Sequence, residues 1–220
     1  MRPIHFVEAL AGLEFENTFN PYSNRCAVHD LEDAPRRRAE TLRAMLEAAV
    51  EAEIDSLWIG RDLGYRGGRR TGLALTDDVH IYAHAERWGV WVQRPTKGQA
   101  VAELTAAIIW RVLSQIRASV FLWNVFPLHP HEAGDPFSNR SHNSHERKAG
   151  EELLSQLIFL LKPRRLIAIG NDAALTAYRL ADQHEVLPVR HPSYGGQTVF
   201  LRQLCQLYDL PKVEAGVCLV

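Results

Sequence analysis

The stretch Ile54-Asp55-Ser56-Leu57-Trp58-Ile59-Gly60 is a short, mostly apolar run that leads into polar, glycine-rich sequence. Three similar runs occur further along the chain, at residues 119–124, 166–170 and 185–190. Runs of this length are typical of strands in a sheet that is covered on both faces. The sequence therefore predicts four short strands in one central sheet.

Segments with helical periodicity surround these strands. Apolar residues recur every three or four positions in 39–53, 99–117, 146–161, 173–181 and 197–208. Strands that alternate with helices form a mainly parallel sheet between helical layers. We therefore predict an α/β fold, a three-layer α/β/α sandwich around a short, mainly parallel, four-stranded central sheet. Residues 1–220 are expected to form a single domain, with residues 1–53 as an N-terminal helical extension packed on the core.

Composition restricts the class of protein. Hydrophobic residues make up 46% of the chain and charged residues 23%, which is an ordinary balance for a globular protein. No apolar run approaches the roughly 20 residues of a membrane span, and the start of the chain has no signal-peptide pattern. We therefore expect no membrane partner and a cytoplasmic location. Cys26, Cys205 and Cys218 are widely scattered, so neither a zinc site nor an iron–sulfur cluster is expected.

The formal net charge is −1, which does not by itself indicate a nucleic-acid partner. Basic residues nevertheless cluster at three places: Arg36 to Arg38; Arg61, Arg66, Arg69 and Arg70; and Arg140, Arg147 and Lys148. We expect the first cluster to be the solvated face of a glutamate-rich helix. The second lies among glycines in a loop after a strand, where a ligand surface is more plausible.

Ligands of open parallel sheets bind beyond the carboxyl ends of the strands, so we expect the functional residues in the loops that follow the strands. Residues 60–72 contain five glycines, which allow close backbone approach to a ligand, and the carboxylate of Asp62. Asn124 ends the second strand, where its amide needs a backbone or ligand partner. The third loop begins with His191-Pro192-Ser193. Each feature alone is more often structural than functional.

Together these loops resemble the two signature motifs of the uracil-DNA glycosylase superfamily and the asparagine between them. Gly60-Arg61-Asp62-Leu63-Gly64 resembles the first signature, which has forms such as GQDPY and GINPG, and His191-Pro192-Ser193 resembles the second. The resemblance to the bacterial branches called families four and five rests on Gly67, Arg70-Thr71-Gly72, Thr76-Asp77 and Asn139-Arg140, although the cysteines for their iron–sulfur cluster are missing. The similarity extends from about Asn20 to Tyr208.

The resemblance implies roles for three catalytic residues. Asp62 would orient and activate a water, and Asn124 would read N3–H and O4 of the base. His191 would donate a hydrogen bond to O2 of the departing base anion, which is the charge that develops as the N-glycosidic bond breaks. The further substrate contacts that it implies are Gly60, Arg61, Leu63, Gly64, Tyr65 and Leu75. The DNA contacts that we predict are Arg70, Arg140, Arg190, Ser193 and Tyr194, of which Arg140, Arg190 and Ser193 have loop ordering as an alternative role.

Several positions depart from the family pattern or carry two interpretations. Leu75 stands where the family has a phenylalanine that stacks on the flipped base. Gly64 replaces the tyrosine of the strictest uracil enzymes, so we predict tolerance of 5-substituted uracils and of hypoxanthine or xanthine. Arg61 would either pair with Asp62 or hold a DNA phosphate. Tyr194 would either act as the wedge that replaces the flipped base or pack on its own loop.

The sequence thus predicts a monofunctional DNA glycosylase that flips and hydrolytically excises uracil or a related deaminated or 5-substituted base. It would initiate base excision repair as a monomer at the nucleoid, with no cofactor and no metal. The alternative is a catalytically weak protein that binds damaged bases or abasic sites. A metal hydrolase built on His129, His131, His142 and His145 is a weaker alternative, because these residues lie in a loop without a convincing fixed helix. A nucleotide-binding protein is weaker still, because the phosphate fingerprints are missing.

Overall fold

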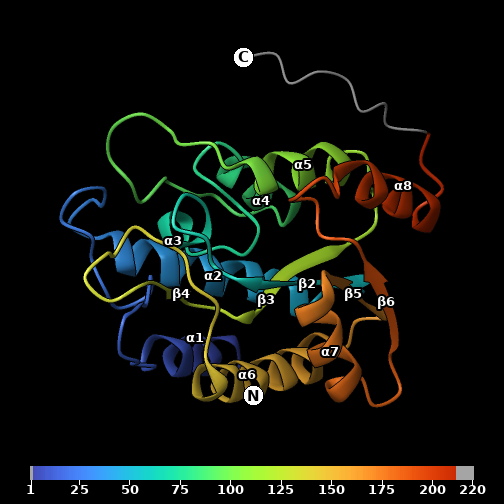
Figure 1. Cartoon of the computed structure of the whole chain (residues 1–220), viewed down its shortest axis with the longest axis horizontal. Helices are drawn as coiled ribbons and strands as arrows, with labels where there is room; N and C mark the ends of the chain where they lie inside the picture. The colour runs from blue at the N-terminus through green and yellow to red at the C-terminus, as the bar shows by residue number, and fades with distance from the viewer. Residues whose placement is uncertain (1, 212–220) are drawn as a thin grey trace.

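The computed structural model describes residues 2–211 (Figure 1). The helices are α1 (Pro3–Ala11), α2 (Ala34–Val50), α3 (Gly68–Thr71), α4 (Ile81–Arg87), α5 (Leu104–Leu113), α6 (Ser144–Leu161), α7 (Asn171–Leu180) and α8 (Gln197–Leu207). The strands are β1 (Thr18–Phe19), β2 (Ser56–Asp62), β3 (Val120–Phe126), β4 (His129–Pro130), β5 (Arg165–Ile169) and β6 (Glu185–Val189).

The central sheet has four strands in the order β3-β2-β5-β6, and all three strand pairs are parallel. The predicted α/β class and the short parallel sheet are therefore confirmed. Strand β2 continues two residues beyond the predicted end, so Asp62 lies in the strand and pairs with Phe126. Asn124 likewise lies within β3, opposite Gly60, and not at its end. Strands β1 and β4 form a separate antiparallel pair.

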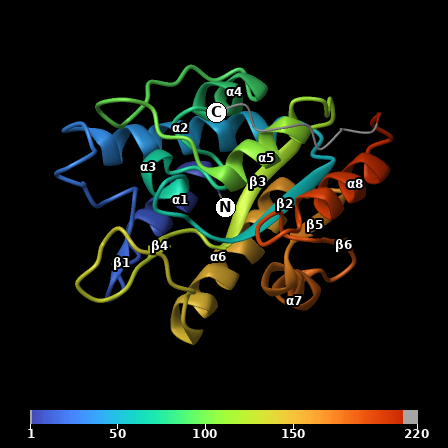
Figure 2. The same ribbon diagram turned by 45° about the horizontal axis from the view of Figure 1, so that its top comes forward.

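Helices cover both faces of the sheet, as Figures 1 and 2 show. Side chains alternate along a strand, so Leu57 and Ile59 face one layer while Trp58 faces the other. The first layer contains α1, α2, α6 and α7, and the second contains α5 and α8. This is the predicted three-layer arrangement. Phe6 and Leu46 belong to the first core, so the N-terminal helices pack on the sheet.

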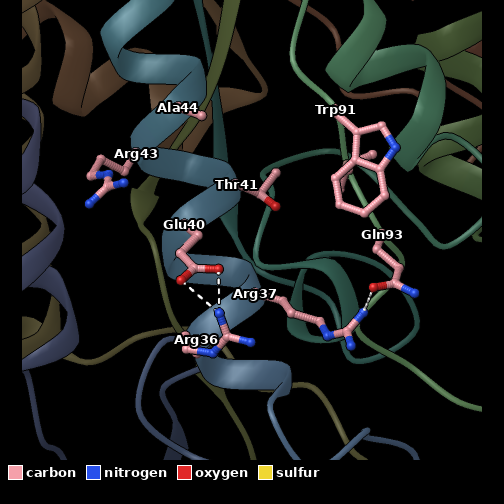
Figure 3. Close-up of a pocket in the computed structure, with 9 residues that line it drawn as sticks. Arg36, Arg37, Glu40, Thr41, Arg43, Ala44, Trp91 and Gln93 are labelled. Atoms are coloured by element: carbon pink, nitrogen blue, oxygen red, sulfur yellow. Dashed lines mark hydrogen bonds and ion pairs between the residues drawn. The ribbon is translucent and has the colours of Figure 1, made fainter.

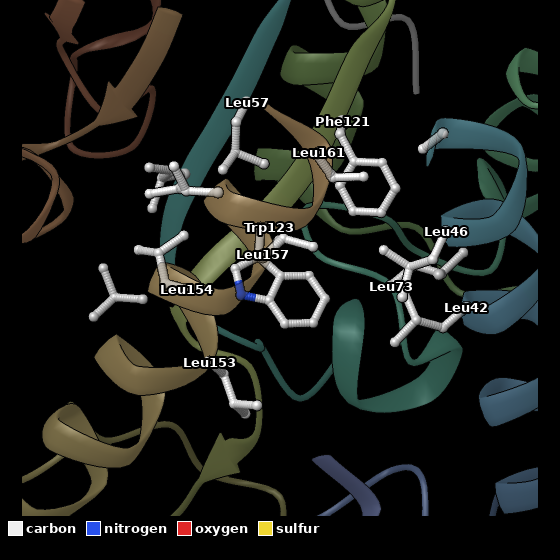
Figure 4. Packing of buried hydrophobic residues seen from close by; sticks show 14 of the residues in the cluster. Leu42, Leu46, Leu57, Leu73, Phe121, Trp123, Leu153, Leu154, Leu157 and Leu161 are labelled. Atoms are coloured by element: carbon white, nitrogen blue, oxygen red, sulfur yellow. The ribbon is translucent and has the colours of Figure 1, made fainter. Parts of the chain in front are cut away.

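Helix α6 packs closely on β3, with leucines such as Leu154 and Leu157 against the sheet beside Trp123 (Figure 4). Gly150 permits this approach, because a Cβ there would overlap the carbonyl oxygen of Val125. The helix begins with a capping box, in which Asn143 and Glu146 satisfy each other's backbone N–H groups. The position of β3, and therefore of Asn124, depends on this contact.

The prediction that Arg36 to Arg38 form a solvated face is wrong for Arg38. Its guanidinium is fully buried and forms an ion pair with the buried carboxylate of Asp30. Its Nε also donates to the Arg70 carbonyl oxygen. A buried charge is stable when it is paired and hydrogen-bonded, and here the partner comes from the loop before the helix. Arg38 on helix α2 therefore holds the backbone of Arg70 in the segment that follows β2.

No helix within residues 2–211 combines the length and the apolar character that crossing a membrane requires.

Candidate active site

Three polar side chains come from the same edge of the sheet, because the carboxyl ends of parallel strands meet there. Asp62 ends β2, and Asn124 lies in the last part of β3. His191 is the second residue after the end of β6. Arg61 connects two of them. Its Nε donates to Asp62 Oδ2 at 2.7 Å, and its charge acts on His191, whose pKa it helps to lower. A carboxylate, a carboxamide and an imidazole thus belong to one strand-end region.

Asn124 is fully buried, and neither Oδ1 nor Nδ2 has a hydrogen-bond partner among the described residues. Leaving a buried polar group unsatisfied costs about 1–3 kcal/mol, so an orphaned carboxamide in a core strand is unusual. It offers one acceptor and one donor side by side, which matches the O4 and N3–H edge of a uracil. This side chain is the clearest sign of a ligand site.

Gly60 and Leu75 shape the space next to Asn124. A Cβ at Gly60 would overlap Asn124 Oδ1 and lie 2.9 Å from a methyl carbon of Leu75, so only glycine fits. Leu75 adopts a left-handed backbone conformation, with φ of 54°. Its carbonyl oxygen accepts a hydrogen bond from Trp110 Nε1 at 3.1 Å, which stabilises this conformation. Leu75, which stands at the position of the family's stacking residue, therefore lies against Gly60 beside Asn124.

Asp62 has two partners. Oδ2 accepts from Arg61, and Oδ1 accepts a short hydrogen bond from Nδ1 of His142. His142 is buried, and its Nε2 lies 3.6 Å from Asp172, which in turn pairs with Arg147. His142, held between Asp62 and Asp172, therefore fixes the position of the Asp62 carboxylate. No local sequence pattern indicates this role of His142, because the pairing spans 80 residues.

His191 is oriented by the turn that contains it. The backbone N–H of Ser193 donates to Nδ1 of His191 at 3.1 Å, so a neutral ring carries its proton on Nε2. Burial lowers the pKa of His191 below its ordinary value, and the charges of Arg61 and Arg190 lower it further. The neutral ring is thereby favoured, and its Nε2–H is the donor that the predicted role requires.

The structure corrects the prediction that Arg70 contacts DNA. The side chain is buried, and its guanidinium pairs with the buried carboxylate of Asp78 at 2.7 Å. Arg140 is largely buried too. It forms two hydrogen bonds to Glu146 and several to backbone carbonyl groups, which favours the alternative loop-ordering role. Since a paired, buried guanidinium is not presented to a phosphate, Arg70 is structural here, whereas a phosphate contact of Arg140 stays a prediction.

The remaining predicted contacts surround the same region. Leu63 is buried, and its N–H donates to the Leu128 carbonyl oxygen. The N–H of Tyr65 donates to Asn139 Oδ1 at 2.9 Å, so Asn139 orders the loop after β2. Arg190 is exposed, and Tyr194 is 98% exposed in a left-handed conformation. Their contacts with substrate and DNA stay predictions.

Two residues at the start of α5 were not singled out from the sequence. Glu103 directs its carboxyl group toward the loop after β2, 3.1 Å from the position of a Cβ on Gly64. Leu104 is 66% exposed, although it is apolar. The next residue, Thr105, lies with its hydroxyl 3.3 Å from that of Ser193, so α5 begins beside the His191 loop. A Glu-Leu pair at the start of a helix carries no sequence signal of this placement.

Within residues 2–211, no group of three or more side chains is arranged to hold a metal ion. The loop histidines make separate contacts: His129 with the Ser138 carbonyl, His131 with the Glu132 carbonyl, and His142 with Asp62. Cys26 and Cys205 are buried free thiols, and Cys218 lies outside the described residues.

A hollow lies between α2 and the segment after α4 (Figure 3). Its arginines have partners, since Arg36 pairs with Glu40 and Arg37 with Gln93. It contains none of the predicted site residues, and the exposed ring of Trp91 forms one wall. This hollow is therefore distinct from the strand-end site.

The fold and the site together define an α/β protein with a carboxylate, an unpartnered carboxamide and an imidazole at the carboxyl ends of a parallel sheet. The chain belongs to the uracil DNA glycosylase superfamily, whose family model matches residues 50–203. No curated protein matches the sequence. Among solved structures, the wild-type SMUG2 of Pedobacter heparinus is similar in fold, with a TM-score of 0.59 at 12% identity over 95% of this chain and 96% of that chain. Superfamily membership supports a DNA glycosylase in general terms.

Proposed function

We propose that this chain is a monofunctional DNA glycosylase that flips uracil, or a related deaminated or 5-substituted base, and hydrolyses its N-glycosidic bond. The observation that carries the proposal is Asn124, whose carboxamide is fully buried without a partner among the described residues. A uracil edge satisfies both of its polar atoms. The reaction begins base excision repair, and we propose a monomer at the nucleoid that needs no cofactor.

Base reading and leaving-group stabilisation fall to two side chains. Asn124 Nδ2 donates to O4 and Oδ1 accepts from N3–H, whereas the edge of cytosine has the opposite polarity there. His191 donates from Nε2 to O2, where negative charge develops as the bond breaks. A preorganised donor of this kind is worth about 3–4 kcal/mol of barrier.

Asp62 is the proposed water-positioning group and stabiliser of the cationic sugar. Each carboxylate oxygen has two acceptor positions, so the bonds to His142 and Arg61 leave room for a water. His142 holds the carboxylate in place. The side chain of Arg61 is 47% exposed, so a DNA phosphate competes for it and releases Oδ2 when DNA binds.

Base flipping costs a few kcal/mol of unstacking, which a side chain inserted into the duplex offsets. Tyr194 is the proposed wedge, because its ring is almost fully exposed on a tight turn beside His191. Leu104 supports it, since the hydroxyls of Thr105 and Ser193 join the two segments that present these apolar side chains. Arg190 is exposed at the same turn and suits a phosphate contact.

A panel of oligonucleotides tests this function. Duplexes and single strands carrying uracil, a thymine mismatch, hypoxanthine, xanthine or 5-hydroxymethyluracil are incubated with the protein, treated with alkali and separated on a gel. We expect alkali-dependent cleavage at uracil that Asp62→Ala abolishes. Cleavage that persists in Asp62→Ala would contradict the role of this carboxylate.

The second candidate is a catalytically weak protein that binds damaged bases or abasic sites. The observation that favours it is the double pairing of Asp62 with Arg61 and His142, which occupies one acceptor position on each of its carboxylate oxygens. The same panel separates the two functions. Tight binding of uracil-containing or abasic DNA without strand cleavage after alkali would favour the binding protein.

A further inference from the structure

The carboxyl group of Glu103 lies against the loop that follows β2. A Cβ at Gly64 would lie 3.1 Å from Glu103 Oε1, and a Cβ at Gly67 would overlap Oε2. Side chains at these two positions would therefore displace the carboxyl group. The two glycines therefore leave space for the Glu103 carboxyl group, and this residue has no role in the proposed excision of the base.

Glu103 is fixed by its backbone, while its side chain has no partner. Its N–H donates to Asp77 Oδ2 at 2.7 Å. The residue is the N-cap of α5, yet its carboxyl group does not cap the helix. Among residues 2–211, its carboxyl oxygens make no hydrogen bond or ion pair. Burial, and next the negative charge of Asp77, raise the pKa of Glu103 to about 7, so its neutral form is well populated at neutral pH.

Glu103 and the orphaned carboxamide of Asn124 border the same loop. Leu75 packs on Gly60 beside Asn124, and the Thr76 carbonyl oxygen lies 3.6 Å from the position of a Cβ on Gly67. Asp77, the next residue, holds Glu103. One short segment, residues 75–77, therefore connects the two polar groups. The contact of Thr105 with Ser193 joins the start of α5 to the His191 turn.

The orientation of a bound pyrimidine follows from the proposed function, on which this inference rests. With O2 on His191 and the N3–H and O4 edge on Asn124, the C5 edge turns away from His191. The family resemblance places Gly64 beside C5, and the Glu103 carboxyl group lies next to Gly64. We propose that Glu103 is a specificity-determining residue that selects pyrimidines whose 5-substituent donates a hydrogen bond, such as 5-hydroxymethyluracil, over thymine.

The physical reason is the carboxyl group's unmet hydrogen bonding. A hydroxymethyl group supplies a donor and an acceptor, whereas a methyl group covers the carboxyl and leaves it unpaired. Sites built to hydrogen-bond a substrate hydroxyl discriminate strongly against the analogue that lacks it, because a buried polar group is then left without a partner.

Binding to uncleavable DNA tests this assignment separately from turnover. Duplexes with the 2′-fluoro forms of 5-hydroxymethyldeoxyuridine and thymidine, opposite the same base, are titrated with the wild type, Glu103→Leu and Glu103→Ala. The wild type should bind the hydroxymethyl duplex about tenfold more tightly, and both variants should lose this preference. Glu152→Gln, which changes an exposed glutamate on α6, is the matched control and should behave as the wild type does.

Equal affinity of the wild type for the two duplexes would overturn the assignment, and so would a preference that survives in either folded Glu103 variant. Glu103→Ala is included because a smaller side chain cannot clash with Gly67, so one variant remains if Glu103→Leu fails to fold. Failure of the proposed function has a different signature, namely no release of uracil from cleavable DNA by the wild type.

Discussion

At the scale of single residues, Asn124 and Asn20 form an informative pair. Both are buried, but Asn20 donates to the carbonyl oxygens of Leu10 and Leu13, whereas Asn124 has no partner among the described residues. A buried asparagine with a structural role has hydrogen-bond partners within the protein, whereas one that binds a ligand has none until the ligand is bound. Their leucine variants should therefore change stability in opposite directions.

We predict that Asn124→Leu raises the free energy of unfolding by about 1–3 kcal/mol, because it removes two unsatisfied polar atoms. Uracil excision should fall by about a hundredfold or more in the same variant. Asn20→Leu, the control, should lower the free energy of unfolding. Urea denaturation and the excision assay measure both effects, and a destabilised Asn124→Leu would mean that the carboxamide has a structural partner.

At the scale of elements, the packing of α6 on β3 positions Asn124. We predict that Gly150→Ala lowers the free energy of unfolding by about 1–3 kcal/mol, since the new methyl group overlaps the Val125 carbonyl oxygen. Gly12→Ala is the control, because a Cβ there lies 3.5 Å from its nearest neighbour, an ordinary contact. Equal denaturation midpoints for the two variants would contradict the close approach of helix and strand.

The turn that follows His191 carries a prediction about base flipping. We predict that Tyr194→Ala reduces excision from duplex DNA about tenfold more than excision from single strands, because only the duplex requires a wedge. Tyr178→Ala, at an exposed tyrosine on α7, should leave both rates unchanged. Single-turnover rates on the two substrates measure this ratio. Equal losses on both would assign Tyr194 to the structure of its loop.

The bounds of the strands and helices also show how much of the fold could be predicted from the sequence. Strands β2, β3, β5 and β6 begin and end within about two residues of their predicted bounds, because buried strands have a strong apolar signal. Helix α3 was missed, since its sequence Gly68-Arg69-Arg70-Thr71 has no apolar periodicity. Helix α5 is shorter than predicted, because apolar residues continue beyond both of its ends.

The candidate site could be predicted in its positions but not in its pairings. Asp62, Asn124 and His191 lie in or just beyond strands, which the strand pattern and the family resemblance both indicated. The partners Asp78 for Arg70 and His142 for Asp62 are tertiary contacts, and no local pattern encodes them. This is why Arg70 was assigned to DNA when it belongs to the core, and why His142 was considered only as a metal ligand.

At the scale of the whole molecule, two buried histidines link stability to pH. Burial lowers the pKa of His84 and of His129 from 6.5 to about 3, so the unfolded chain binds more protons than the folded one between these values. Each of these histidines should therefore contribute a loss of stability as the pH drops below about 6.5, of about 2 kcal/mol at about pH 5, while Glu103, with its raised pKa, contributes in the opposite direction.

Urea denaturation at neutral pH and at about pH 5 measures this loss. The variant His84→Gln should lose about 2 kcal/mol less than the wild type on acidification. Glutamine can still reach the Thr76 hydroxyl, which contacts the His84 ring at 2.9 Å, so the comparison isolates the titrating group. An identical loss in variant and wild type would show that His84 titrates normally in the folded protein.

The proposed reaction requires that Asp62, Asn124 and His191 surround one base. A crystal structure with duplex DNA that carries 2′-fluoro-2′-deoxyuridine, which resists cleavage, tests this most directly. We predict a flipped uracil with O4 and N3–H on the Asn124 carboxamide, O2 on Nε2 of His191, and Asp62 facing C1′ across a water. A uracil that stays stacked in the duplex, or a flipped base with Asn124 still unpartnered, would contradict the account.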